Sequence, residues 1–136
     1  MSRLAQGFQI TGAAIGACSS PKVSAISASR TARICELNDT FRQSLAIGKQ
    51  CVLTPGVFAM GAAFVTDALS AIRVFQDFNA DGDPYGEHDF GVFSLADTFC
   101  VWKIDYYDLT LHFGSEDPAD IAQTKRVLTV MLLEEY

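Results

Sequence analysis

The chain has 136 residues, of which 49% are apolar and 19% charged, and it carries a net charge of −6. This length and balance predict one folded domain and exclude a largely disordered chain. The acidity argues against non-specific binding to nucleic acid, whose phosphates require a basic surface. It is also concentrated, because residues 77–120 hold eleven Asp or Glu against the single Lys103, whereas residues 1–76 carry a net charge of +4. Such a region is either a solvated face or a surface for a basic partner.

Two amphipathic helices and a short strand are expected in the first half of the chain. Apolar residues at spacings of three and four predict one helix from Thr31 to the stop signal at Gly48, and a second over residues 62–77. Between them, residues 50–54 indicate a buried strand that ends at a Pro-Gly turn signal. Glycines and a proline exclude a helix from the loop at residues 79–88.

The second half predicts a hairpin followed by a helix. Two β-rich runs, DFGVFSL and FCVWKIDYY, predict a hairpin over residues 89–107, and a further short strand fits residues 109–113. Asp117-Pro118 suits a helix start and predicts a final helix over residues 118–134. Its buried side chains would be Ile121, Val127, Leu128, Met131 and Leu132. The fold class expected is therefore α+β, with a small antiparallel sheet packed against about three helices.

Residues 1–30 are rich in Ser, Ala and Gly, and we expect a flexible N-terminal tail before a single domain over residues 31–136. No segment is long and apolar enough to cross a membrane, because Pro55-Gly56 interrupts the best candidate, residues 50–66. The four cysteines form no C-x-x-C pair, which favours free thiols in a reducing cytoplasm over a zinc framework or disulfides.

Alternation along the second hairpin strand separates two sets of side chains. The set expected in the core is Trp102, Ile104 and Tyr106. The opposite set, a candidate recognition stripe, is Lys103, Asp105 and Tyr107. If Asp97-Thr98 form a two-residue turn, His88 lies opposite Tyr107, and a slip of one residue places Asp89 there instead.

The stretch Asp77-x-Asn79-x-Asp81-Gly82 matches the opening of a calcium-binding loop. The match then fails, because the twelfth position is His88 rather than a bidentate Glu, and a strand follows in place of a helix. Turn chemistry explains the same Asp, Asn and Gly residues. A divalent cation at Asp77, Asn79 and Asp81 therefore ranks below a plain turn, and we expect no cofactor.

A histidine between two carboxylates, Glu87-His88-Asp89, offers a candidate acid/base group beside Tyr85. The enzyme that it would suit is a small metal-assisted or acid/base hydrolase centred on His88 with Glu87, Asp89 and Asp105. No nucleophile elbow, phosphate-binding glycine loop or second nearby histidine accompanies it. A histidine that caps the loop through backbone contacts is the favoured interpretation. Enzyme activity stays open.

Three stretches carry a family resemblance: DPYGEHDFGVF, WKIDYYD and DPAD…TKRVLTVMLLEEY. They resemble an uncharacterised bacterial family, a domain of unknown function, over roughly residues 31–136. The resemblance implies small proteins of plasmids and genomic islands, sometimes near anti-restriction genes, and implies no catalytic residues. Relatives tend to have Asn where this chain has Gly82, before Asp83-Pro84, so position 82 is not expected to supply a side-chain ligand.

The function favoured by these observations is that of a non-enzymatic protein-binding accessory protein of bacterial mobile elements. Its partner would be a protein with a basic surface that normally holds nucleic acid, which makes an anti-restriction or anti-CRISPR inhibitor the specific expectation. The acidic loop and hairpin would form the binding surface. Its residues would be Asp81, Asp83, Tyr85, Glu87, His88, Asp89, Lys103, Asp105 and Tyr107.

Overall fold

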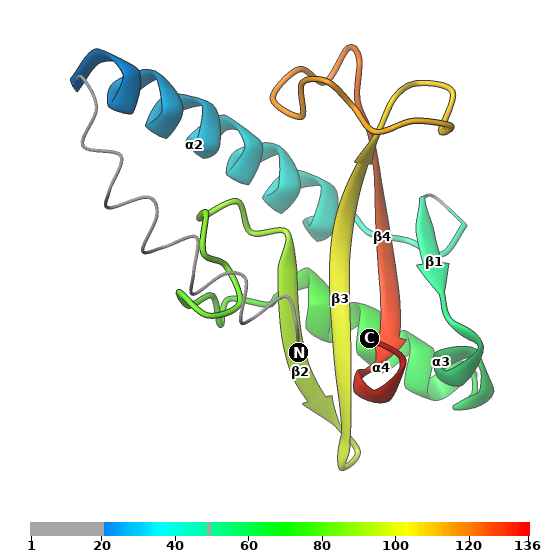
Figure 1. The fold of residues 1–136 in the computed structure, drawn as a ribbon. Coiled ribbons are helices and arrows are strands. Elements are labelled where there is room, and N and C mark those ends of the chain that lie inside the picture. The colour runs from blue at the N-terminus through cyan, green and yellow to red at the C-terminus, as the bar shows by residue number, and fades with distance from the viewer. Residues whose placement is uncertain (1–20, 49) are drawn as a thin grey trace.

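A computed structural model describes residues 21–48 and 50–136 (Figure 1). The elements in chain order are α2 (Pro21–Gln43), β1 (Cys51–Leu53), α3 (Pro55–Ala59), α4 (Ala62–Arg73), β2 (Phe90–Leu95), β3 (Thr98–Tyr107), β4 (Lys125–Leu132) and the 3-10 helix η1 (Leu133–Glu135). The strands form one sheet in the order β1-β4-β3-β2. The α+β class is confirmed, but the sheet is mixed, because β1 pairs parallel to β4 while the other pairs are antiparallel.

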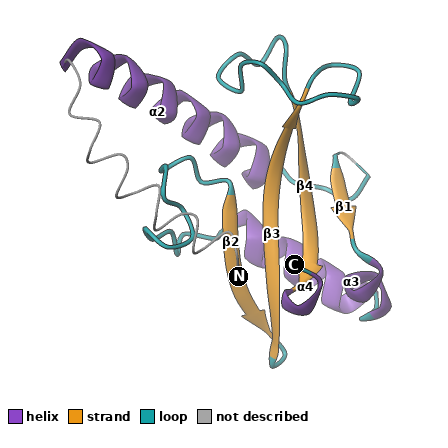
Figure 2. Ribbon diagram, viewed as in Figure 1, coloured by secondary structure: helices purple, strands orange, loops and turns teal. Residues whose placement is uncertain are grey.

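The main core lies between the helices and one face of the sheet (Figure 2). Trp102 and Ile104 of β3 are buried there, as the strand alternation predicted, and Tyr106 packs against the same cluster. The buried side chains that cover this face come from the helices and the residues just after them: Leu45, Val57, Val65, Leu69, Ile72 and Phe75. On the opposite face, Phe90, Val101 and Met131 form a smaller buried cluster.

Helix α2 begins at Pro21, well before the predicted start at Thr31, so residues 21–30 of the expected tail are helical. Residues 1–20 of that tail lie outside the described residues. Helix α4 ends at Arg73 rather than near residue 77. The carbonyl oxygens left free at this end are satisfied by the buried Arg42 guanidinium, whose Nη1 donates to those of Ile72 and Phe75 at 2.8 and 3.0 Å.

The final helix predicted over residues 118–134 is wrong, because residues 125–132 form β4 in the middle of the sheet. Arg126, Leu128 and Val130 are buried on the helix-covered face, while Ile121 is exposed. Residues 127–132 are apolar at every position except Thr129, and such a run imitates the spacing of a buried helix. The β-branched Val127, Thr129 and Val130 are the signal that favours the strand.

The predicted hairpin exists, but its register is different. Ala96 and Asp97 form the two-residue turn, both with positive φ (51° and 61°), and Phe90 pairs with Lys103. Neither His88 nor Asp89 therefore lies opposite Tyr107. This register places Gly91 opposite Trp102, where the absent side chain makes room for the indole.

The predicted strand at residues 109–113 is also wrong, because this segment is a turn joined to β3 by one bridge between Tyr107 and Gly114. Within the described part of the chain, no helix is both long and apolar enough to span a bilayer. Cys35, Cys51 and Cys100 are free thiols.

Gly91→Ala should destabilise the fold, because the new Cβ would stand 2.7 Å from Phe75 Cζ and against the Trp102 ring. We expect a loss of about 1–3 kcal/mol in the free energy of unfolding, measured by urea titration. Gly114→Ala is the matched control, since its Cβ would meet Tyr106 O at an ordinary 3.9 Å. Equal losses in the two variants would contradict the packing argument.

Candidate functional site

A buried amide holds the 77–90 loop against α2. The Asn38 side chain is fully buried, and its Nδ2 donates to the Glu87 carbonyl oxygen at 2.9 Å and to the Tyr106 hydroxyl at 2.8 Å. Its Oδ1 accepts a hydrogen bond from Arg126 Nε at 2.6 Å. Both donors and the acceptor are therefore used, and one residue links α2 to the loop, β3 and β4.

Glu87 continues this network. Its Oε1 accepts a hydrogen bond from the Tyr106 hydroxyl at 2.9 Å. Burial raises the pKa of the Glu87 carboxyl above its usual value, although the Tyr106 hydrogen bond acts in the opposite direction. Burial likewise raises the pKa of Tyr106. Glu87 is thus part of the buried interface between loop and sheet rather than a freely solvated acid.

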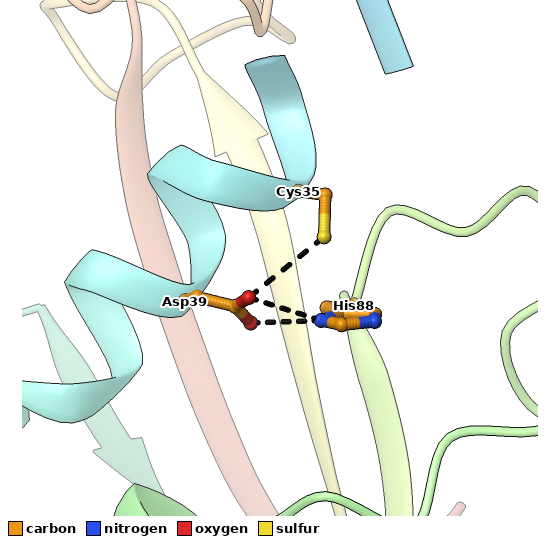
Figure 3. A group of neighbouring side chains, drawn as sticks. All are labelled: Cys35, Asp39 and His88. Atoms are coloured by element: carbon orange, nitrogen blue, oxygen red, sulfur yellow. Dashed lines mark hydrogen bonds and ion pairs between the residues drawn. The ribbon is translucent and has the colours of Figure 1, made fainter. Parts of the chain in front are cut away.

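His88 lies beside α2, with its Nδ1 2.9 Å from Asp39 Oδ1 and 3.1 Å from Oδ2 (Figure 3). A carboxylate only accepts, so this contact requires the proton on Nδ1. The ring stacks on Phe78 at 3.7 Å between centroids. Its Nε2 lies 3.8 Å from Oδ2 of the buried Asp83, whose Oδ1 accepts from the His88 amide. The left-handed backbone at His88, φ 56°, is held by that bond.

Cys35 lies one turn before Asp39 on the same face of α2, and its Sγ donates to Asp39 Oδ2 at 3.8 Å (Figure 3). Burial, reinforced by Asp39 and Asp83, raises the pKa of the Cys35 thiol to about 11. This thiol is therefore not an activated nucleophile.

A cleft of about 440 Å³ opens beside this cluster. His88 and Asp39 line it together with Arg42, Arg73 and Phe78. Arg42 Nη2 donates to Asp39 Oδ1 at 2.9 Å, and its guanidinium lies 5.3 Å from the Phe78 ring centre. The cleft is polar and charged rather than apolar.

The residues of the candidate calcium loop form a turn. Asn79 Oδ1 accepts from the backbone amides of Asp81 and Gly82, both at 3.0 Å, which is turn chemistry. Asp77 and Asp81 are exposed. Among the described residues, the three acidic, cysteine or histidine ligand atoms that all lie within 4.8 Å of one another belong instead to Cys35, Asp39 and His88.

The structure divides the predicted binding surface between the two faces of the sheet. Glu87 and His88 contact groups on the helix-covered face, and Asp83 is buried. Lys103, Asp105 and Tyr107 alternate with the core residues of β3 and so belong to the other face. Lys103 and Asp105 form an ion pair at 2.6 Å. Tyr85 and Asp81 are exposed, and Asp89 is partly buried.

A second surface feature, which the sequence did not predict as a binding site, is the turn of residues 108–113, here called the apolar turn. It exposes three large apolar side chains: Leu109 (53%), Leu111 (46%) and Phe113 (73%). Together with residues 114–124 it projects beyond the end of the sheet (Figure 2). The alternation of apolar residues in LTLHF suggested a strand, and no sequence signal distinguished a strand from a turn with exposed tips.

Glu87→Gln should stabilise the protein increasingly as pH rises. The folded state favours the protonated carboxyl, so wild type loses stability as pH rises from the ordinary Glu value through the raised pKa, whereas the glutamine of the variant does not ionise. The new amide can still accept the Tyr106 hydrogen bond. Urea unfolding at about pH 4 and about pH 7 should show the variant gaining relative to wild type. Glu134→Gln, at an exposed position, is the control. If the difference in unfolding free energy between Glu87→Gln and wild type is the same at both pH values, the argument is wrong.

Comparison with known proteins gives one match. A family model described as a protein of unknown function, DUF3768, matches residues 53–135. No curated protein and no solved structure matches the chain. The expected resemblance to a domain of unknown function is confirmed, although the match starts at residue 53 rather than near residue 31 and so excludes α2. His88, Asp83 and the apolar turn lie inside the matched segment. The chain therefore belongs to the DUF3768 family of proteins of unknown function.

Proposed function

We propose that this protein is a non-enzymatic protein-binding protein and that the apolar turn is its principal contact surface. The observation that supports this proposal is the exposure of Leu109, Leu111 and Phe113 within five residues. Scattered apolar residues on a surface need no explanation, but a contiguous group is typical of an interaction site. Phe113 is the natural anchor, because large aromatic side chains dominate binding energies.

The apolar turn is held in one conformation by its own hydrogen bonds. Asp108 Oδ1 accepts from the Thr110 amide at 3.1 Å, the Thr110 hydroxyl at 2.7 Å and the His112 amide at 3.3 Å. These hydrogen bonds lower the pKa of the Asp108 carboxyl, and the bond from the Thr110 hydroxyl has the largest effect. Leu111 keeps a left-handed φ of 63°. A fixed turn loses little conformational entropy when it binds, which favours recognition.

The charge around the turn suggests the partner. Residues 108–124 contain four carboxylates and no Lys or Arg. A partner with an apolar pocket inside a basic surface would complement both features. A protein that normally holds nucleic acid presents such a surface, so an anti-restriction or anti-CRISPR role on a mobile element is consistent with the proposal. That narrower role depends on the family resemblance described above.

The second candidate is the small enzyme centred on His88, and the cleft beside this residue supports it. Two of its expected partners lie elsewhere, since Glu87 bonds to Tyr106 and Asp105 pairs with Lys103. His88 Nε2 faces the buried Asp83 at 3.8 Å. These contacts favour a positioned histidine over one ready to exchange a substrate proton, and we rank binding first.

The double variant Leu109→Ser with Phe113→Ser should weaken partner capture at least about tenfold, because it removes the apolar anchors. The measurement is affinity capture from lysate of the natural host, quantified by mass spectrometry across increasing salt. A genuine partner should be released by salt, as expected for an acidic surface on a basic one.

The matched control is Phe58→Ser with Val74→Ser, which removes two apolar side chains that are at least as exposed (72% and 73%) and lie away from the turn. It should capture the partner as wild type does, and circular dichroism should show both variants folded. The proposal requires at least one protein that wild type and the control both capture and that the turn variant does not. If no such protein is found, the proposal is wrong.

A further inference from the structure

Cys35, Asp39 and His88 present three different metal-binding atoms around one point (Figure 3). Asp39 Oδ2 lies 3.8 Å from Cys35 Sγ and 3.1 Å from His88 Nδ1. Ligand atoms at the corners of a zinc tetrahedron are separated by about 3.3–3.6 Å, given bonds of about 2.0–2.3 Å. These two separations bracket that range, and all three ligand atoms lie within 4.8 Å of one another, so side-chain adjustments would bring them onto one ion.

We propose that Cys35, Asp39 and His88 bind one transition-metal dication of the zinc class, with a fourth position open to solvent. A thiolate, an imidazole and a carboxylate together suit zinc, whereas magnesium and calcium select oxygen ligands alone. The inference is independent of the proposed protein-binding function, because the apolar turn supplies none of these ligands.

Each oxygen of Asp39 has a distinct role in this arrangement. Oδ1 accepts from Arg42 Nη2 at 2.9 Å, which orients the carboxylate, and it also lies 2.9 Å from His88 Nδ1. Oδ2 is the oxygen that lies near both other ligand atoms, 3.1 Å from His88 Nδ1 and 3.8 Å from Cys35 Sγ. The Arg42 guanidinium is itself fixed, because Nη1 is bonded to the end of α4. Asp39 would therefore bind through Oδ2, while Oδ1 keeps its hydrogen bond from Arg42.

Asp83 supplies the outer support of His88. When Nδ1 binds a metal, the ring proton must move to Nε2, and Nε2 lies 3.8 Å from Asp83 Oδ2. Closing this gap to hydrogen-bond distance gives the carboxylate–histidine–metal arrangement that commonly fixes a metal-bound imidazole. Asp83 is buried and held by the His88 amide, so it is positioned for that contact.

Charge and access are both compatible with a dication. A thiolate at Cys35 and the Asp39 carboxylate would neutralise it, while Arg42 and Asp83 balance one another. The side chains of His88 and Asp39 are 28% and 30% exposed and line the cleft, which gives a path for the ion and room for water at the fourth position. The metal would join α2 to the 77–90 loop.

The test uses cobalt(II) as a spectroscopic probe and zinc(II) as a competitor, with the full chain stripped of metal under a non-chelating reductant. One equivalent of cobalt should produce a thiolate-to-cobalt charge-transfer band together with tetrahedral ligand-field bands, and zinc should abolish both. Absence of the thiolate band in folded wild type overturns the proposal, whatever the variants show.

Two matched pairs locate the site. Cys35→Ser should lose the thiolate band and Cys51→Ser should keep it, since Cys51 is a free, partly buried thiol on β1 outside the cluster. His88→Gln should weaken cobalt affinity at least about tenfold, whereas the exposed His112→Gln should not. Asp83→Asn should weaken it about tenfold while leaving circular dichroism unchanged. A thiolate band that survives Cys35→Ser, or unchanged affinity in His88→Gln, contradicts the assignment.

Discussion

The buried side chain of Asn38 is the constraint on which the arrangement of the helix, loop and sheet depends. An amide removed from water must have all its hydrogen bonds replaced, and here they are supplied by the loop backbone, Tyr106 and Arg126. Each partner belongs to a different segment, so α2 can occupy only one position against the sheet. Apolar packing tolerates sliding, whereas this set of directional bonds does not. The positions of Asp39 and Cys35 follow from it.

The sequence predicted the existence of α4 and the core face of β3 from their apolar spacing. Trp102 and Ile104 are buried as expected, but the alternation did not predict the burial of Val101 on the opposite face. Strand β4 was mistaken for a helix because residues 127–132 are apolar at every position except Thr129, so the sequence does not show the alternation of burial that the strand has. The hairpin register could not be read either, because Ala96 and Asp97 carry none of the usual Asn-Gly or Gly-rich signals for a turn with positive φ.

The candidate site was predicted only in part. The sequence placed carboxylates around His88, but it could not show which of them would be buried, and Asp83 proved to be enclosed. The partners that decide the chemistry of His88 come from α2, about fifty residues earlier in the chain. No local pattern joins such distant positions. Cys35 and Asp39 are visible in the sequence as a helical pair, but only their contact with His88 makes them a set of ligands.

The boundary of the family match has a consequence for how this protein is divided into folding units. The matched segment starts at residue 53, after α2 has ended. A fragment limited to that segment would leave the Glu87 carbonyl, the Tyr106 hydroxyl and Arg126 Nε without the partner that Asn38 provides. It would also uncover the end of α4 that Arg42 satisfies. The shared segment alone therefore lacks buried hydrogen-bond partners that the preceding helix α2 supplies in this structure.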